Sequence, residues 1–304
     1  MIYGLIAAIG WGTSAIAATN AARRAGTYLA VLGGQGVGVA ALVILAVFMH
    51  SALVAMDMAT AVGLVGAGLL GLLGYLTFYR ALEYGGAVGL ISAISASYGG
   101  ITTLLAVIVL GENIGGPGAA GVVLAVTGVA MASASSSASA PAPPIAVAEP
   151  IVGLAPWPSR VRSLSRAGVP LALASAVTYG IGGFLLGDYS AKEGALGSAL
   201  VAHASSVTAL LLALPLLLGR RKARRASTSG MIWATAAGLT DVIGLLAFAR
   251  GGQSGQVALT AAVSSIFPAI PLVAGLVMFG ERLRQQQLLG VILIIAGLVM
   301  IGLA

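Results

Sequence analysis

The sequence predicts an all-α integral membrane protein in which ten transmembrane helices form two inverted five-helix repeats. Three observations favour this fold class. Hydrophobic residues make up 59% of the 304 residues and charged residues only 8%, whereas a soluble domain carries roughly a quarter. The second half of the chain repeats the first at a nearly constant offset. Finally, the basic residues gather in alternate loops between apolar segments.

Ten apolar segments are long enough to cross a membrane, since about 20 apolar residues span ~30 Å of hydrocarbon. They comprise residues 2–19, 27–49, 59–81, 87–110, 116–134, 169–187, 196–218, 231–249, 256–279 and 286–304. Residues 1–134 and 168–304 therefore hold five spans each. Between them, residues 135–167 contain a Ser/Ala/Pro-rich tract and a basic end, which we interpret as a flexible linker. A regulatory linker is the alternative.

The two halves share a sequence pattern. GENIGGPGAAGVVLAVTGVAM at 111–131 aligns without a gap with GERLRQQQLLGVILIIAGLVM at 280–300, and GYLTFYRALEYG at 74–85 matches GLLAFARGGQSG at 244–255. Because each half holds an odd number of spans, the second half must enter the membrane upside down. The repeat is therefore expected to be inverted.

The basic residues support this inversion. Thirteen of the fifteen follow the first, third, fifth, seventh or ninth span: Arg23, Arg24, Arg80, Arg160, Arg162, Arg166, Arg220, Arg221, Lys222, Arg224, Arg225, Arg282 and Arg284. Only Lys192 and Arg250 lie on the other side. By the positive-inside rule, we expect both termini outside and the linker inside a bacterial-type plasma membrane. Residues 1–19 lack a basic leader, so no cleavable signal is expected.

Several of the repeated residues resemble a known family. They are Trp11 and Gly12, FYRALEYG at 78–85, LGE at 110–112 with Gly121 and Gly128, and FGE at 279–281 with Gly290 and Gly297. In these features the chain resembles the drug/metabolite transporter superfamily, specifically its ten-helix members with two EamA-type repeats. The resemblance covers nearly everything except the linker. It implies that export of amino acids or related metabolites is more common than uptake. The two inverted repeats predict transport by alternating access around a mid-membrane site.

The chain departs from the family pattern in two places. Family members usually carry a proline in the middle of the fourth and ninth spans. The ninth span has Pro268 and Pro271, whereas the fourth has Gly99 and Gly100. We expect these residues to break both helices at mid-depth, where freed backbone groups are tolerated only beside protein or a wet cavity. Small multidrug pumps of the superfamily couple protons through a glutamate in their first helix, but the first span here has no acid.

Two titratable residues lie within the expected spans. Asp241 is the eleventh residue of segment 231–249 and therefore lies near mid-bilayer, where a carboxylate is costly and usually functional. His203 lies about a third of the way along segment 196–218. Antiparallel packing brings the two to similar depths, so we expect both on the substrate pathway and assign them the coupling proton. The alternatives are a neutral Asp241 and a His203 that each bond a neighbouring helix.

A solute cavity is expected beside the broken helices. Trp11 and Tyr179 occupy equivalent positions in the two repeats, as do Gln35 and His203. Small and polar residues recur at helical spacing in the fourth and ninth spans, although packing alone explains such a stripe. The expected lining residues are Trp11, Gln35, Ser95, Tyr98, Tyr179, His203, Asp241, Ser264 and Phe267. Glu112 and Glu281 precede the next helices, so we interpret both as structural caps at positive helix N-termini.

These features favour a secondary transporter for a small neutral, zwitterionic or partly apolar solute. A passive facilitator or channel is the alternative, and an enzyme is disfavoured because no nucleophile motif is present. The chain has no cysteine, no P-loop and no metal-ligand cluster, so neither a cofactor nor a metal is expected. The net charge of +7 lies in loop clusters and forms no nucleic-acid-binding face. Expected partners are the solute and membrane lipids, with the chain a monomer or homodimer.

Overall fold

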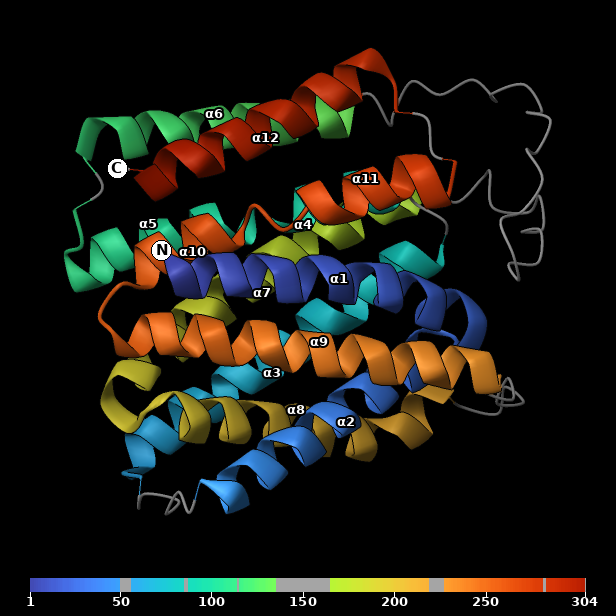
Figure 1. The fold of residues 1–304 in the computed structure, drawn as a ribbon, viewed down its shortest axis with the longest axis vertical. Coiled ribbons are helices and arrows are strands. Elements are labelled where there is room, and N and C mark those ends of the chain that lie inside the picture. The colour runs from blue at the N-terminus through green and yellow to red at the C-terminus, as the bar shows by residue number, and fades with distance from the viewer. Residues whose placement is uncertain are drawn as a thin grey trace.

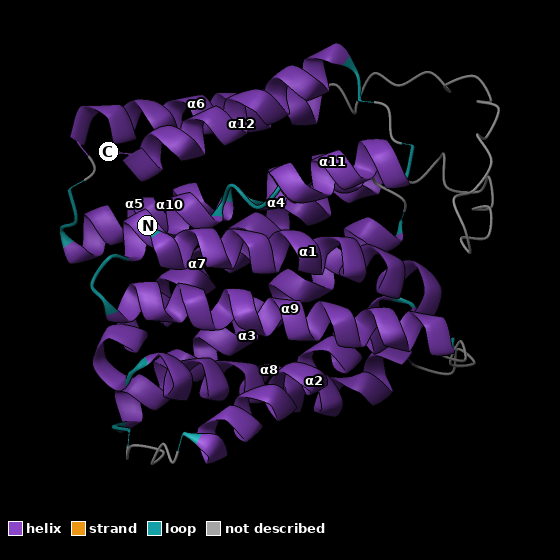
Figure 2. Ribbon diagram, viewed as in Figure 1, coloured by secondary structure: helices purple, strands orange, loops and turns teal. Residues whose placement is uncertain are grey.

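A computed structural model describes residues 1–49, 56–84, 87–113, 115–134, 165–218, 227–280 and 283–303. Helices and short turns account for this part of the chain, which contains no strand (Figure 2). In order, the helices are α1 (Ile2–Ala25), α2 (Thr27–Phe48), α3 (Met58–Glu83), α4 (Val88–Ser95), α5 (Tyr98–Leu110), α6 (Gly115–Ala134), α7 (Ser165–Glu193), α8 (Ala195–Leu218), α9 (Thr228–Gln253), α10 (Val257–Ser264), α11 (Ala269–Met278) and α12 (Gln285–Leu303).

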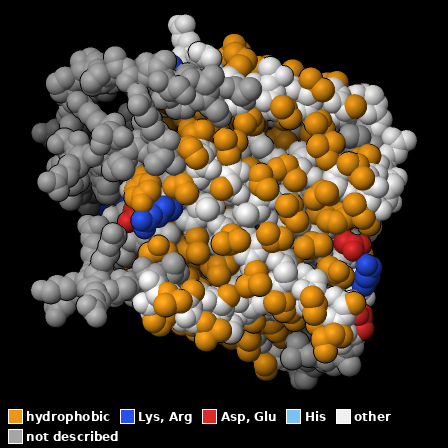
Figure 3. All heavy atoms as spheres, turned by 180° about the vertical axis from the view of Figure 1, so that it is seen from behind, with side chains coloured by type: hydrophobic (Ala, Val, Ile, Leu, Met, Phe, Trp, Pro, Cys, Tyr) orange, Lys and Arg blue, Asp and Glu red, His pale blue; other side chains and the backbone are white. Residues whose placement is uncertain are grey.

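The helices have the length and surface of a membrane protein. Eight described spans are long and apolar enough to cross a bilayer, counting α4 with α5 and α10 with α11 as one span each. Two shorter apolar helices, 115–129 and 285–301, complete the ten. Large apolar side chains face outward, and the middle of the face in Figure 3 carries no blue or red. The predicted fold class, an all-α membrane protein with ten spans, is confirmed.

The two halves are inverted relative to each other. In Figure 1, α1 runs from the N-terminal side toward the opposite side, whereas its repeat counterpart α7 runs the other way. The halves also exchange equivalent contacts: α1 packs along α9 as α3 packs along α7, and α6 packs along α12. Both chain ends lie on the same side of the molecule (Figure 1).

Several helices extend beyond the expected apolar segments. α1 continues to Ala25, α9 continues to Gln253, and α7 begins at Ser165, inside the segment expected to be linker. Hydropathy marks only the part of a helix that lies in hydrocarbon, while backbone hydrogen bonds continue through polar residues until a cap ends them. The rest of the expected linker, 135–164, lies outside the described residues.

The fourth and ninth spans are both broken, but the first break is not where the glycines are. α4 ends at Ser95 and α5 begins at Tyr98, so Gly99 and Gly100 lie in the first turn of α5. The expected break at these glycines is therefore wrong. The turn is made by Ala96 and Ser97, whose backbone continues with three-residue hydrogen bonds such as Ser97 N–H to Ile94 C=O, 3.2 Å.

In the ninth span the break covers residues 265–268, so Pro268 lies where we expected a break. Its ring removes one amide donor from the helical ladder. Pro271, by contrast, is the third residue of α11 and breaks nothing. This is a first-turn position, where a missing N–H leaves no helical bond unmade. The prediction that Pro271 interrupts the helix is therefore wrong.

Carboxylates cap helices across the structure. Glu112, just after α5, accepts a hydrogen bond from the amide of Ala258 in the first turn of α10, 3.1 Å. The capped helix thus belongs to the other repeat, rather than being the next helix in sequence. At the opposite side, Glu83 accepts from the amide of Thr27 at the start of α2, 3.1 Å. Glu281 lies outside the described residues.

Removing this carboxylate is expected to weaken the contact between α5 and α10. We expect Glu112→Ala to lower the free energy of unfolding by about 1 kcal/mol, because a free helix amide loses its acceptor. Glu112→Gln keeps an oxygen acceptor and should lose less. Equilibrium denaturation of the purified protein in detergent measures both changes, and an equal loss in the two variants would contradict the capping role.

Candidate functional site

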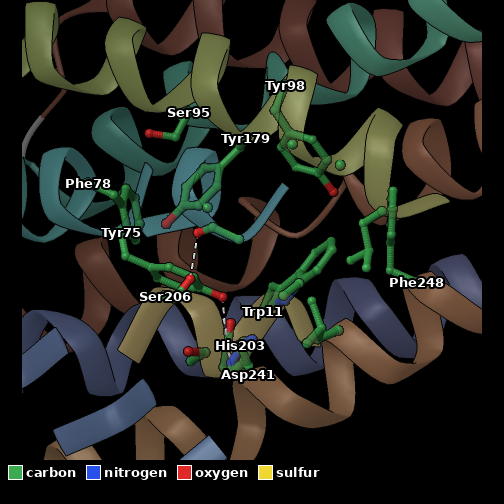
Figure 4. Close-up of a pocket in the computed structure, with 18 of the residues that line it drawn as sticks. Trp11, Tyr75, Phe78, Ser95, Tyr98, Tyr179, His203, Ser206, Asp241 and Phe248 are labelled. Atoms are coloured by element: carbon green, nitrogen blue, oxygen red, sulfur yellow. Dashed lines mark hydrogen bonds and ion pairs between the residues drawn. The ribbon is translucent and has the colours of Figure 1, made fainter. Parts of the chain in front are cut away.

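A cavity of about 120 Å³ lies between the two halves of the described chain. This volume holds several waters or one small solute. Its wall includes residues of α1, α3, α4 and α5 from the first half, and of α7, α8 and α9 from the second. Figure 4 shows the labelled side chains converging on this space from opposite sides. The site therefore depends on the packing of one repeat against the other.

Asp241 is the acidic group of the cavity wall. Its side chain comes from the middle of α9, and the residue is only 5% exposed. The Tyr75 hydroxyl, from α3, donates a hydrogen bond of 2.7 Å to Asp241 Oδ2. His203 Nε2, from α8, lies 3.5 Å from the same oxygen and is 3% exposed at the residue level. A carboxylate, a phenol and an imidazole from three helices thus form one buried cluster.

This cluster is short of hydrogen-bond partners. His203 Nε2 has no hydrogen-bond partner in the described part of the chain. Its 3.5 Å separation from Asp241 Oδ2 is within the range of an ion pair. Burying an unpaired polar group costs free energy, which is recovered when a proton, water or solute completes the contact. The cluster therefore leaves a buried ring nitrogen beside Asp241 that a polar group entering the cavity can contact.

Aromatic rings make up much of the remaining wall. Trp11 meets Tyr98 edge-on at 5.8 Å between ring centroids and packs against Phe248 at 5.5 Å. Tyr75 meets Tyr179 edge-on at 5.4 Å. These pairs use rings from both repeats, and the two edge-on pairs have the geometry that aromatic quadrupoles favour. The wall is therefore largely apolar, with its polar groups concentrated at few points.

The broken helices contribute the upper part of the site in Figure 4. Tyr98 and Ser264 share a hydrogen bond of 2.6 Å between their hydroxyls, which joins the two breaks. Ser95 shares one of 2.7 Å with Ser175 of α7. Ser95 and Tyr98 also line the cavity (Figure 4). The two interruptions thus place hydroxyls beside the cavity, although Ser97 Oγ in the first break has no hydrogen-bond partner within the described residues.

Comparison with known proteins decides the family. A sequence model of the EamA-like transporter family matches residues 1–134 and 166–303, nearly the whole chain. The chain belongs to the EamA-like transporter family. It is therefore an integral membrane transporter of the drug/metabolite type, as the sequence resemblance implied.

Comparison by structure concerns the fold. The fold of this EamA-like transporter is similar to a crystal structure described as "Crystal structure of protein", with a TM-score of 0.69. The likeness covers 99% of this chain and 96% of the other at 15% sequence identity, so it concerns the fold alone. Among curated proteins, no relative matches this chain.

Seven of the nine residues expected on the pathway line the cavity of this EamA-like transporter: Trp11, Ser95, Tyr98, Tyr179, His203, Asp241 and Phe267. Ser264 lies one layer behind, bonded to Tyr98. Gln35 is buried in α2 and is not among the lining residues. Its Oε1 has no hydrogen-bond partner within the described residues. The structure thus brings Asp241, His203 and residues beside the two helix breaks to one cavity. Gln35 lies outside the cavity wall.

Sequence reasoning missed the cavity face of α3. Tyr75, Phe78 and Tyr79 all line the site, and Tyr75 bonds the central acid. A signal was present in the repeat itself. Gly71, Tyr75 and Phe78 lie at helical spacing and align, at an offset of 170, with Asp241, Leu245 and Phe248 of α9. All six residues line the cavity. Among the described residues, no group of three or more acids or histidines is placed to hold a metal.

Proposed function

We propose that this EamA-like transporter is a proton-coupled secondary transporter that exports small organic metabolites by alternating access. Amino acids are the solutes that the family resemblance implies. The observation that carries the proposal is the buried Asp241–Tyr75–His203 cluster on the wall of a cavity between inverted repeats. Inverted repeats of this kind rock around a central site, so that the site opens to one side of the membrane at a time.

A buried acid supplies the coupling in this proposal. Charge on Asp241 costs several kcal/mol in a low-dielectric cavity unless a proton or a cationic group neutralises it. A solute that occupies the site displaces the proton, and the proton displaces the solute once the cavity faces the other side. His203, 3.5 Å away, provides a second acceptor through which the proton reaches or leaves the acid.

The proposed orientation follows the charges. Arg23 and Arg24 lie in the last turn of α1, and Arg80 lies in the last turn of α3. α1 ends at the side of the molecule opposite to the two chain ends (Figure 1). The positive-inside rule places that side in the cytoplasm and both termini outside, in a bacterial-type plasma membrane. Each chain contains two complete repeats, so we propose that it works as a monomer or within a homodimer, surrounded by lipid.

Reconstitution into liposomes tests the function. We expect an imposed pH gradient to drive accumulation of one or more solutes from a panel of amino acids and related metabolites against their concentration gradients. With the membrane potential clamped at zero, exchange of one proton per solute supports about a tenfold concentration ratio per pH unit. Equilibration that ignores the gradient would instead indicate the passive facilitator, and no movement of any solute would contradict both.

A further inference from the structure

The cavity has an uneven set of charged groups. Asp241 is its acid, His203 is its titratable base, and no lysine or arginine is among its 23 lining residues. Described basic side chains lie at helix ends, where Arg80 contacts Glu83, Lys192 contacts Asp188 and Arg250 contacts Gln253. From this asymmetry we infer that the solute is an organic cation, an amine carried on an apolar body. This inference rests on the proposed function, because it narrows the small organic metabolite of the same site to an amine, in place of the amino acids that the family resemblance implies.

An ammonium group complements Asp241. Tyr75 already donates to Oδ2 of this carboxylate, which fixes its position toward the cavity. A cation beside the carboxylate completes a buried ion pair, whereas an empty site leaves the acid to a proton. One group thus binds either the proton or the amine, which gives the exchange a direct physical basis.

The carboxylate of an amino acid has no such complement here. Inside about 120 Å³ it would share the space with Asp241 and would meet His203 and neutral donors, the hydroxyl groups and the indole N–H of Trp11. Bringing two carboxylates into one buried site is unfavourable, because each opposes the charge of the other. The site therefore selects an amine over the amino acid that has the same side chain.

Aromatic rings suit the same ligand. Trp11, Tyr75, Tyr98 and Tyr179 line the cavity around the acid cluster (Figure 4). The faces of such rings attract cations, most strongly for tryptophan, and their area also binds an apolar body. A stacked ring and a neighbouring carboxylate together favour an ammonium group and disfavour an anion.

Gly71 provides room for the body of the ligand. It lines the cavity from α3 at the repeat position of Asp241, and a Cβ built on it meets no atom within 4 Å. We therefore expect a larger side chain at this position to take up part of the cavity, because its Cβ meets no neighbouring atom. Gly66 of the same helix also has open space around a Cβ but does not line the cavity, so it is a matched control.

Matched ligand pairs test the inference. Binding of tryptamine and tryptophan, and of phenethylamine and phenylalanine, is measured by calorimetry on the purified full-length protein in detergent. We expect each amine to bind at least about tenfold more tightly than its amino acid, a difference of about 1.4 kcal/mol. Asp241→Asn should remove this preference. Gly71→Leu should weaken tryptamine binding at least about tenfold but spare methylamine, while Gly66→Leu changes neither.

The outcomes separate this inference from the proposed function. The inference is overturned if tryptophan binds as tightly as tryptamine or more tightly. In that case proton-driven amino-acid flux in liposomes would still support the proposed function. An amine preference that survives Asp241→Asn also overturns the inference. Asp241-dependent tryptamine binding without any gradient-driven flux would support the assigned ligand class and contradict coupled transport. Circular dichroism and gel filtration identify any variant that fails to fold. For the Gly71 and Gly66 variants that fold, methylamine binding is the internal reference against which tryptamine binding is compared.

Discussion

Exchange of Asp241 for asparagine is expected to abolish proton-driven accumulation. In a gradient of two pH units at zero membrane potential, one-proton exchange supports an accumulation ratio of about 100 for the wild type. The variant should fall to a ratio of about 1, because asparagine cannot carry the proton. The asparagine amide has the size of the carboxylate and keeps one oxygen that can accept a hydrogen bond from Tyr75. In the wild type this hydrogen bond joins the Tyr75 hydroxyl to Asp241 Oδ2 at 2.7 Å. The measurement is uptake of labelled solute into liposomes that contain each protein.

The matched control for this exchange is Asp188→Asn. Asp188 is also a transmembrane-helix aspartate, but it pairs with exposed Lys192 at 3.0 Å and does not line the cavity. It should retain the wild-type ratio, since a surface ion pair contributes little. If Asp241→Asn accumulates solute as the wild type does, the proton is carried elsewhere. If the wild type and both variants equilibrate the solute without responding to the gradient, the transporter is a facilitator.

The fold could be predicted largely from the sequence because few backbone conformations are stable in the hydrocarbon of a membrane. Every backbone polar group in hydrocarbon needs an internal partner, so an apolar run of about 20 residues becomes a helix. The repeat then fixes the relation between the halves, and the alternating charges agree with it. Helix ends were less predictable. Ala25 and Gln253 end helices well past the apolar runs, since caps and hydrogen bonds decide the end rather than hydropathy.

The site was predictable only in part, because its contacts join distant segments. Asp241 was conspicuous as an acid in an apolar span, and the repeat pointed to Trp11 and Tyr179. The bond between Asp241 and Tyr75 links residues 166 positions apart, and hydropathy does not show which face of α3 turns inward. A tyrosine also fits a lipid-facing or interfacial position equally well. The glycine pair misled for a related reason, since a glycine serves close packing as readily as it interrupts a helix.

Gly99 gives the second large expected effect, which concerns packing between the broken helices. A Cβ on Gly99 would collide with the Ser265 side chain, with its Cβ at 2.7 Å, and would lie 2.9 Å from the carbonyl oxygen of Ala261. Because Ser265 lies in the second break and Ala261 in the last turns of α10 before it, Gly99→Ala must push the start of α5 away from this segment. We expect it to lower the free energy of unfolding by about 1–3 kcal/mol, the usual cost of overpacking. Equilibrium denaturation in detergent measures the loss.

Gly100 is the control one residue away. A Cβ built on it meets no atom within 4 Å, although it occupies the same first turn of α5. Gly100→Ala should therefore leave stability unchanged or raise it by up to about 1 kcal/mol, because alanine favours the helix. Both variants add one methyl group in the first turn of α5, and they differ in the atoms that this methyl group faces. If the adjacent glycines served only to loosen the helix, both substitutions would change stability alike. Opposite effects instead locate the requirement in the close contact between the breaks, which also holds Tyr98 against Ser264 at the solute cavity.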